Sequence, residues 1–192
     1  MRRCVAEVNL FHRVYILRRL NGTTNTLGVF MYQPPADVLE KALGIALIAH
    51  AGQKDKAGAP YILHPLRLMM TAEEPDTQVT ALLHDVLEDS ELTEDDLNQA
   101  GIPEHIAAAV AALTRQIDET YEEFIARIAE DPLARRVKIL DIQDNLNLKR
   151  LKSVNKADLL RVTEYHRALQ VLLEAEAADE TSADELDDYN QP

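Results

Sequence analysis

The sequence has one cysteine, no tryptophan and few aromatic residues of any kind. Cys4 is the single cysteine, and aromatic residues make up 5% of the 192 residues. One cysteine excludes an internal disulfide framework and is typical of a protein of the reducing cytoplasm. Hydrophobic residues amount to 46%, with much alanine and leucine, which favours helices over sheets. At this length we expect one domain with a sizeable core.

The sequence also lacks a long apolar run and a basic charge balance. No segment is apolar enough over a sufficient length to cross a bilayer, because the longest helical segments carry charges at every turn. The formal net charge of −13 argues against a partner that is a nucleic-acid polymer, which would need a basic face. Eight acidic residues and no basic ones lie in 174–192, so the rest of the chain carries only about −5. An anionic substrate is compatible with that balance, particularly beside a metal ion.

Composition divides the chain into three parts. Residues 1–33 are an N-terminal extension with arginines among apolar residues, which could form an amphipathic membrane-surface helix or a targeting segment. The alternative is that Met31 is the natural start and that residues 1–30 are upstream sequence. Residues 34–176 are the predicted domain, and residues 177–192 are predicted to be a disordered acidic tail. No function is assigned to residues 1–30, and no membrane partner is expected.

Hydrophobic residues recur at helical spacing from residue 36 to about residue 176, and no alternating strand of useful length is present. The predicted fold is an all-α, compact bundle of about seven or eight helices. Thr93 and Thr120 are predicted N-caps, Asp131 precedes a proline that begins a helix, and Asp76 or Thr77 caps the helix that runs into ALLHD. The segment GQKDKAGAP, with two glycines and a proline, is predicted to be a loop.

Residues 81–90, ALLHDVLEDS, place four titratable side chains directly after three apolar ones. We expect one helix through this segment, on which His84 lies above Glu88, and Asp85 lies above Asp89, near the C-terminal end. Carboxylates there face the negative end of the helix dipole and need a positive partner, for which a divalent cation is the candidate. The alternative is a solvent-facing acidic helix end with an incidental histidine.

Two other positions strengthen the case for a metal. His64 lies at a loop-to-helix corner before a proline, and Asp141 lies among apolar residues on a helix predicted to be buried. A buried carboxylate needs a partner, which for Asp141 is either a metal or a salt bridge to Lys138 or Arg136. The residues that together offer nitrogen and oxygen ligands are His64, His84, Asp85 and Asp141. Such a set suits Mn²⁺, Fe²⁺, Zn²⁺ or Mg²⁺ better than Ca²⁺.

Four segments, in order, resemble the sequence motifs of one family. AHAGQKDKAGAPYILHP, ALLHDVLEDS, EHIAAAVAALTR and VKILDIQDNL are similar to segments of the RelA/SpoT hydrolase domains and their small stand-alone relatives. These are phosphohydrolases of the HD superfamily. The resemblance covers about residues 36–175 and implies an all-α HD-domain bundle with a central metal site. It also implies hydrolysis of the 3′-diphosphate of guanosine tetraphosphate (ppGpp) to GDP and pyrophosphate.

The resemblance implies roles for individual residues by position. The metal ligands would be His64, His84, Asp85 and Asp141, with Mn²⁺ as the family's usual ion and another divalent transition metal as the alternative. Glu88 and Asp89 match the pair that handles the attacking water and the leaving group. Lys54, Lys56 and Asn145 are the implied substrate-binding residues. His50 is a rival metal ligand, which we assign to supporting the loop.

The match fails where the family binds the base. Its guanine-contacting Arg-Lys pair aligns with Asp55 and Lys56, so an acid replaces the arginine. Lys54, one position earlier, could supply the charge but not a planar stacking group. Asp144 adds an acid near the expected phosphates, whereas Asn145 keeps its place and is expected to contact ribose.

These departures leave the exact nucleotide open. The leading interpretation is a cytoplasmic Mn²⁺-dependent phosphohydrolase whose partner is a phosphorylated nucleotide, with a guanosine polyphosphate as the first candidate. One alternative is an HD-domain nucleotidase or phosphodiesterase that acts on another nucleotide, and a second is a non-catalytic HD-fold nucleotide-binding module. No synthetase half follows the last predicted helix, so hydrolysis without synthesis is expected. The sequence does not predict the oligomeric state.

Overall fold

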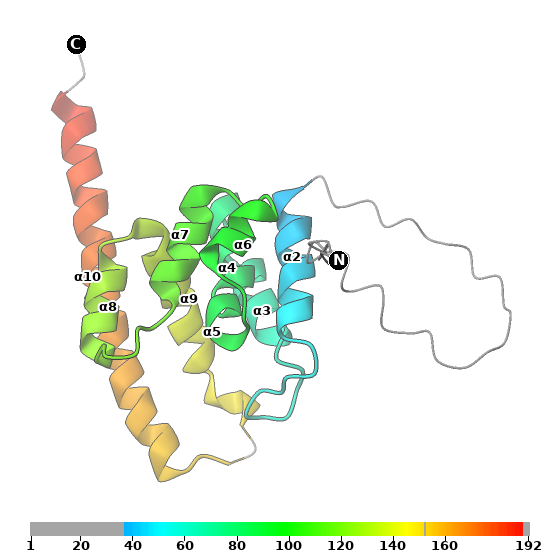
Figure 1. The fold of residues 1–192 in the computed structure, drawn as a ribbon. Helices are drawn as coiled ribbons and strands as arrows, with labels where there is room; N and C mark the ends of the chain where they lie inside the picture. Colours follow the sequence, from blue (N-terminus) through cyan, green and yellow to red (C-terminus); the bar gives the residue numbers. More distant parts are fainter. Residues whose placement is uncertain (1–36, 152, 190–192) are drawn as a thin grey trace, which may run out of the picture. The chain divides into compact units, whose positions relative to one another are not determined.

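The computed structural model describes residues 37–151 and 153–189, and helices are the regular elements of this part of the chain (Figure 1). The N-terminal extension with its two interpretations lies outside the described residues. One isolated bridge between Lys54 and Pro60 closes the loop that was predicted from its glycines and proline. The predicted all-α fold class is confirmed. None of the helices in the described ranges combines the length and the apolar character that a membrane span requires.

The helices follow one another with short connections. In chain order they are α2 (Val38–Ala49), α3 (Leu63–Thr71), α4 (Pro75–Leu83), α5 (Val86–Asp89), α6 (Glu94–Gln99), α7 (Glu104–Leu113), α8 (Tyr121–Ala129), α9 (Pro132–Asn145), the 3₁₀ turn η1 (Leu148–Arg150) and α10 (Lys156–Tyr189).

Three helices begin at the capping residues that the sequence predicted. Thr93 and Thr120 each form a capping box, in which the threonine and the acidic residue three positions later satisfy each other's backbone amides. Asp131 accepts hydrogen bonds from two amides of the first turn of α9. The prediction of Asp76 or Thr77 as the cap of α4 is wrong. Glu74 is the N-cap there, because Pro75 has no amide hydrogen and suits the first helical position.

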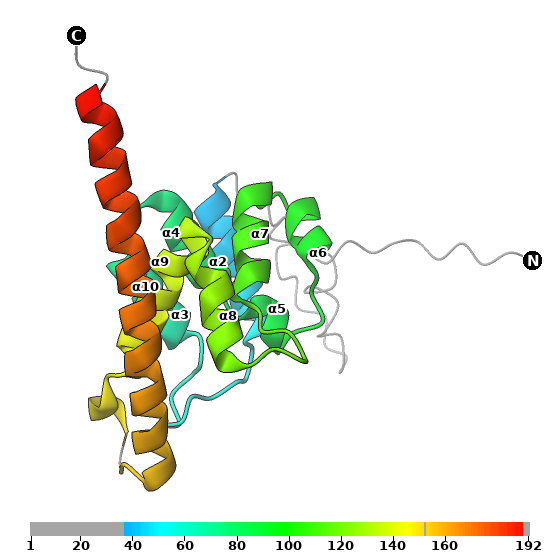
Figure 2. The same cartoon turned by 90° about the vertical axis from the view of Figure 1, so that its left-hand side faces the viewer.

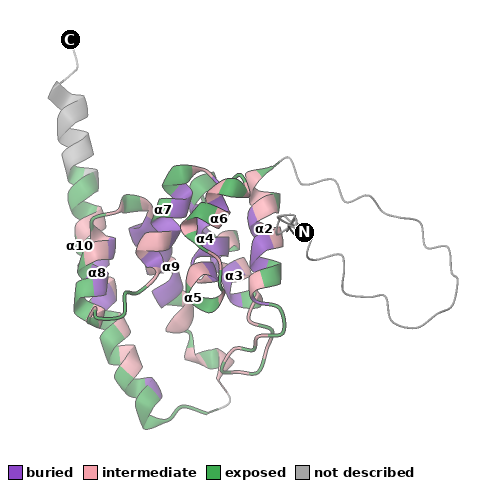
Figure 3. Cartoon of the chain, in the orientation of Figure 1, coloured by how far each residue is buried: buried purple, intermediate pink, exposed green. Residues whose placement is uncertain are grey.

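The core forms around α4 and α9. Helix α4 packs against α2, α3, α7 and α9, while α9 also packs against α3, α7, α8 and α10. Figure 3 shows the buried residues gathered where these helices face one another. The fully buried side chains include Leu82, Ile128, Val137, Ile142 and Leu172. Packing of α3, α4 and α9 against one another brings residues from three distant segments to one place.

The prediction of one continuous helix through ALLHDVLEDS is wrong. Helix α4 ends at Leu83 with His84 as its C-cap, and α5 begins at Val86 with Asp85 as its N-cap. His84 Nδ1 lies 2.9 Å from the carbonyl oxygen of Ala81, so a side chain takes a backbone acceptor at the end of the helix. His84 is 2% exposed, whereas Glu88 is exposed, so the two do not share one buried face.

The last helix is longer than expected. We predicted that it ends at about residue 176, but α10 continues to Tyr189. Figure 2 shows it running along α8 and α9. Arg135 of α9, 3% exposed, donates to Glu176 at 2.5 Å and also to Asp179. These ion pairs, together with the good helix propensity of alanine, glutamate and leucine, extend the helix beyond the predicted boundary.

Candidate metal centre and adjoining pocket

Three packed helices supply the residues that were predicted to bind a metal. His64 lies in the first turn of α3, Asp141 lies on α9, and His84 and Asp85 occupy the break between α4 and α5. The break places both neighbours at the same centre, which consecutive residues of an uninterrupted helix would not reach together because they point about 100° apart.

The ligand atoms of these residues converge. One atom each from His64, His84 and Asp141 lies within 4.8 Å of the others, and all three residues are buried. His64 Nε2 is 3.1 Å from Asp141 Oδ1, and His84 Nε2 is 4.0 Å from the same oxygen. Asp85 joins them, because its Oδ2 lies 2.8 Å from His84 Nε2. The structure therefore brings together all four residues that the sequence predicted as ligands.

Both histidines have one ring nitrogen engaged and the other directed at the centre. The Nδ1 of His84 donates to the Ala81 carbonyl, and the Nδ1 of His64 donates to Asp144 Oδ2 at 2.7 Å. In the neutral form each Nε2 then carries the lone pair, which is the arrangement of a metal-binding histidine. His84 Nε2 is buried, and its 2.8 Å approach to Asp85 Oδ2 is an ion-pair contact without the geometry of a hydrogen bond. A lone pair facing carboxylate oxygens is repelled unless a cation lies between them, so the residues present fit a divalent metal.

Electrostatics also favour a positive charge at the centre. Burial lowers the pKa of His84, but the charges of Asp85 and Asp141 outweigh burial and raise it to about 9. Burial raises the pKa of Asp85, yet the charge of His84 lowers it to about 2. The pKa of Asp141 is likewise held below its usual range, against burial, first by the charge of Lys138. The raised pKa of His84 means that these surroundings stabilise a positive charge at the centre.

Asp141 has the predicted alternative partner as well. Lys138 Nζ lies 2.8 Å from Asp141 Oδ2, so the salt bridge that the sequence allowed is present. Asn145 Nδ2 donates to the other oxygen, Oδ1, at 2.6 Å. The two oxygens therefore differ in role: Oδ2 pairs with the lysine, while Oδ1 faces the histidines. One carboxylate thus takes part in both the salt bridge and the candidate metal site.

Asp144 is not the free acid that the sequence suggested. Arg67 holds it with two hydrogen bonds of 2.8 Å each, and Arg150 Nη2 lies 3.3 Å from its Oδ2. Because the same carboxylate accepts a hydrogen bond from His64, Asp144 orients this candidate ligand, while Arg67 neutralises the charge of Asp144. Sequence reasoning missed Arg67, and its position one helical turn after His64 on α3 is the only sign of its role.

Glu88 and Asp89 lie at the exposed end of α5, next to the centre. The pKa of each carboxyl is raised, first by partial burial and then by the charge of Asp85. Asp89 Oδ2 lies 3.6 Å from His50 Nδ1. Carboxyls with raised pKa values exchange protons closer to neutral pH, which suits acid–base work.

His50, which is buried, and Tyr61, which is partly buried, lie beside Asp85. His50 Nδ1 lies 2.9 Å from Gln53 Oε1, and its ring centre lies 4.9 Å from that of Tyr61. The Tyr61 hydroxyl donates to Asp85. Burial, and then the charge of Asp85, raise the pKa of Tyr61 well above its usual range, so it remains a donor. His50 lies outside the three-residue group with converging ligand atoms, which fits the loop-supporting role that we assign to it.

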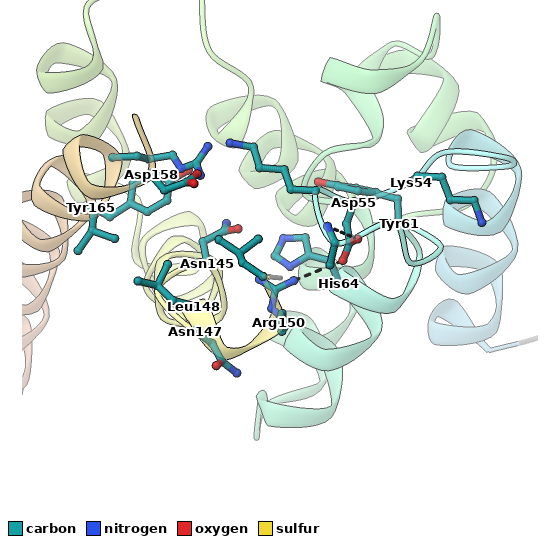
Figure 4. A pocket seen from close by; sticks show the side chains of 15 residues that line it. Lys54, Asp55, Tyr61, His64, Asn145, Asn147, Leu148, Arg150, Asp158 and Tyr165 are labelled. Atoms are coloured by element: carbon teal, nitrogen blue, oxygen red, sulfur yellow. Dashed lines mark hydrogen bonds and ion pairs between the residues drawn. The ribbon is translucent and has the colours of Figure 1, made fainter. Parts of the chain in front are cut away.

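A pocket of about 220 Å³ opens beside the centre (Figure 4). All three residues predicted to bind substrate, Lys54, Lys56 and Asn145, line it. Tyr61 and His64 line it too, so the pocket reaches the metal centre. Its lining also contains residues that sequence reasoning missed: Leu148, Arg150, Arg161 and Tyr165. They come from η1 and α10, beyond the last motif, and no short motif marked them.

Comparisons with known proteins support a relationship in sequence and in fold. No family model matches the chain. A guanosine-3′,5′-bis(diphosphate) 3′-pyrophosphohydrolase of Aquifex aeolicus is 32% identical over 127 residues, covering 60% of this chain and 18% of the relative. A GTP pyrophosphokinase of Streptomyces antibioticus is 34% identical over 137 residues, covering 62% of this chain and 16% of the relative. The chain thus spans less than a fifth of the length of these curated relatives.

A solved structure shares the fold. A metazoan ortholog of SpoT that hydrolyses ppGpp aligns with a TM-score of 0.61 and 20% identity, over 73% of this chain and 88% of that one. The resemblance to RelA/SpoT-type proteins that four sequence segments indicated is confirmed by these comparisons. The predicted all-α fold is shared with that structure.

Proposed function

We propose that this chain, a relative in sequence of the guanosine-3′,5′-bis(diphosphate) 3′-pyrophosphohydrolases, is a metal-dependent phosphohydrolase that converts ppGpp to GDP and pyrophosphate. The observation that carries the proposal is the buried group of His64, His84 and Asp141, whose ligand atoms converge beside a pocket lined with cationic side chains. We place the proposed reaction in the cytoplasm, because the nucleotide substrate is found there and because a chain with one cysteine needs no oxidising compartment.

The proposed metal ligands are His64, His84, Asp85 and Asp141, and the proposed ion is Mn²⁺. A mixed set of imidazoles and carboxylates suits this ion, and each histidine already has the second hydrogen bond that fixes its tautomer. When bound, a divalent cation lowers the pKa of water and neutralises charge on phosphate oxygens. Tyr61 steadies Asp85, and Lys138 steadies Asp141, so two of the four ligands are held by further side chains.

In the proposed reaction a water oxygen bonds to the phosphorus attached to the 3′ oxygen, and the bond from that phosphorus to the 3′ oxygen breaks. Glu88 accepts the proton of the water, because its raised pKa makes it a better base than an ordinary carboxylate. Asp89, next to His50, hydrogen-bonds the water or the departing 3′ oxygen, which takes up a proton to give GDP. The former water oxygen leaves in pyrophosphate.

The pocket supplies the complement to a polyphosphate. Lys54 and Lys56 bring positive charge from the loop after α2, and Asn145 offers a side-chain amide between the centre and the rest of the pocket. Asn145 donates to Asp141 through one amide hydrogen, so a hydrogen and the carbonyl oxygen of its side chain are left for a ribose hydroxyl.

A second candidate is an HD-domain nucleotidase or phosphodiesterase that acts on a different phosphorylated nucleotide. Asp55 favours it, because the structure places this acid on the pocket lining at the position where the related hydrolases carry a guanine-contacting arginine. The two candidates share the metal chemistry and differ only in the nucleotide.

The test is hydrolysis of ppGpp by the full chain in the presence of Mn²⁺, followed by separation of the nucleotide products. We expect release of GDP and pyrophosphate that EDTA abolishes, and no turnover by Asp85→Asn, which loses an anionic ligand. A wild-type chain that binds one Mn²⁺ and leaves ppGpp intact would contradict the alarmone proposal and direct the assay to other nucleotides. Full turnover by Asp85→Asn would contradict the proposed metal site.

A further inference from the structure

We propose that Arg150 binds the nucleobase of the substrate by stacking its planar guanidinium group on the base, and that Asp55 holds it in place. The inference rests on the proposed function, because it concerns the substrate end of the same site. Arg150 is the last residue of η1, five residues beyond the end of α9, and none of the four motif segments includes it.

Arg150 is held at its edges by two segments of the chain. Its Nη1 lies 3.6 Å from Asp55 Oδ2, on the loop after α2. Its Nη2 donates to the backbone oxygen of Asp144 at 2.9 Å and lies 3.3 Å from the carboxylate of the same residue. Figure 4 shows the side chain between η1 and that loop, with His64 close by. The guanidinium is therefore fixed in orientation before a ligand enters the pocket.

The charge of Arg150 is already compensated. Asp55 and Asp144 are both mostly buried, each with 13% of its side chain exposed, so their charges act on Arg150 with limited screening by solvent. Arg67 balances Asp144, which leaves Asp55 to balance Arg150. A guanidinium in this situation has little net charge to offer a phosphate. The Arg150 side chain is 26% exposed and lines the pocket, where a planar group can stack on a base.

The surroundings of Arg150 suit a flat, largely apolar ring. Leu148, Leu151 and Val162 line the same pocket, on the side formed by η1 and α10. Nucleic-acid bases bound by proteins commonly stack on aromatic side chains and on the planar guanidinium group of arginine. Asp144 contacts both His64 and Arg150, so a single side chain connects the metal centre to the proposed base site.

Asp55 divides its two oxygens between two tasks. Oδ1 accepts from the amides of Ala57 and Ala59, at 2.9 and 2.8 Å, and so shapes the loop. Oδ2 is the oxygen that faces Arg150. This explains why an acid stands at position 55. The loop lacks an arginine of its own, η1 supplies Arg150 instead, and Asp55 of the loop holds Arg150 in place.

The experiment compares Arg150→Ala and Arg150→Lys with the wild-type chain in three measurements. These are kcat and KM for ppGpp with Mn²⁺, the Kd for GDP by calorimetry, and inhibition by inorganic pyrophosphate, which has no base. We expect KM and the Kd for GDP to rise roughly 5- to 100-fold in both variants, the usual range for loss of one base-stacking contact. We expect pyrophosphate inhibition and kcat to change little. Lys149→Ala, which removes an exposed neighbouring cation outside the pocket lining, is the matched control.

A further variant keeps the guanidinium and weakens its support. Asp55→Asn retains an acceptor for the loop amides but loses the charge that faces Arg150, so KM should rise, though less than in Arg150→Ala. Mn²⁺ binding by each variant, measured by titration, reports whether the metal centre is intact. Wild-type stoichiometry is expected throughout, and loss of Mn²⁺ from the Arg150 variants would overturn the inference in favour of a supporting role through Asp144.

The outcomes separate this inference from the proposed function. Suppose that the wild type hydrolyses ppGpp. If Arg150→Lys then has the KM of the wild type, or if pyrophosphate inhibition weakens as much as GDP binding does, Arg150 contacts phosphate and the inference is wrong. Unchanged KM and Kd in both variants would also overturn it. If the wild type leaves ppGpp intact, yet both variants bind GDP more weakly, the proposed reaction fails and the base site stands. A wild type that neither hydrolyses ppGpp nor binds GDP overturns both.

Discussion

At the scale of single residues, the proposed metal centre depends on the side chains and backbone groups that hold its proposed ligands in place. His84 and His64 each donate Nδ1–H, one to the Ala81 carbonyl and the other to Asp144, and this leaves Nε2 for the centre. A backbone carbonyl cannot be removed by substitution, but a carboxylate can. Asp144 is therefore the position at which the orientation of a ligand can be tested without touching the ligand.

Replacement of Asp144 by asparagine should weaken Mn²⁺ binding about 10-fold, at the low end of the usual range for loss of such a supporting group. The asparagine keeps the shape of the side chain but no longer carries the charge that His64 and Arg67 share. Titration of the metal-free protein with Mn²⁺ measures the effect. Asp95→Asn, at an exposed position of α6, should bind as the wild type does, and equal affinity in both variants would refute the role of Asp144.

Replacement of Glu88 by glutamine should leave Mn²⁺ bound and lower turnover of ppGpp by roughly 10²–10⁴-fold, the range for general acid–base groups. Glutamine is of the same size but cannot take a proton from water. The measurement is kcat at saturating substrate, together with the stoichiometry of bound metal. Glu91→Gln, just beyond α5 and exposed, serves as the control, and turnover at the wild-type rate in Glu88→Gln would show that another group is the base.

The sequence indicated the candidate ligands but not the residues that orient them or balance their charge. His64, His84, Asp85 and Asp141 stand out because titratable groups beside apolar residues need a reason to be there. Arg67 and Asp144 are 77 positions apart, and their pairing exists only because α3 and α9 pack together. The same holds for Asp55 and Arg150, which come from a loop and from η1. An exposed-looking charge in a sequence does not reveal its partner in the fold.

At the scale of elements, helix starts are the most predictable feature and helix ends the least. The caps Thr93, Thr120 and Asp131 act within three residues of themselves, so local sequence determines them. The break at His84 depends on a side chain that takes the Ala81 carbonyl, and periodicity alone does not detect it. The length of α10 depends on Arg135 of another helix, which no local pattern contains.

Replacement of Arg135 by glutamine should lower the free energy of unfolding by about 2 kcal/mol, in the range for hydrogen bonds to charged groups. The change removes ion pairs to Glu176 and Asp179 and the hydrogen bond to the Ala129 carbonyl. Urea denaturation measures the loss, and amide hydrogen exchange should become faster in α10 beyond residue 175. Arg167→Gln, on the exposed surface of α10, is the comparison, and equal stability of the two variants would argue against the role of Arg135.

At the scale of the whole molecule, the proposed ion would join three helices. Its ligands come from α3, from the α4–α5 break and from α9, so unfolding separates them and releases the metal. Binding to the folded state alone stabilises a protein in proportion to the logarithm of the free ligand concentration.

Mn²⁺ at about 100 times its Kd should therefore add about 2.7 kcal/mol to the free energy of unfolding, and EDTA should remove this gain. Thermal denaturation with and without the ion measures the shift in Tm. Asp85→Asn, which lacks one anionic ligand, should show little or no shift under the same conditions. A wild-type Tm that Mn²⁺ does not change, at a concentration where titration shows binding, would mean that the ion does not link the helices.

The distance along the chain between the first and last ligand has a consequence for how the protein matures. His64 and His84 leave the ribosome well before Asp141, and the centre is incomplete until α9 has packed against α3 and α4. A nascent chain that ends before α9 therefore offers two histidines and one carboxylate on elements without their packing partner. The proposed ion would therefore find its full set of ligands only after the helical core has closed around Asp141.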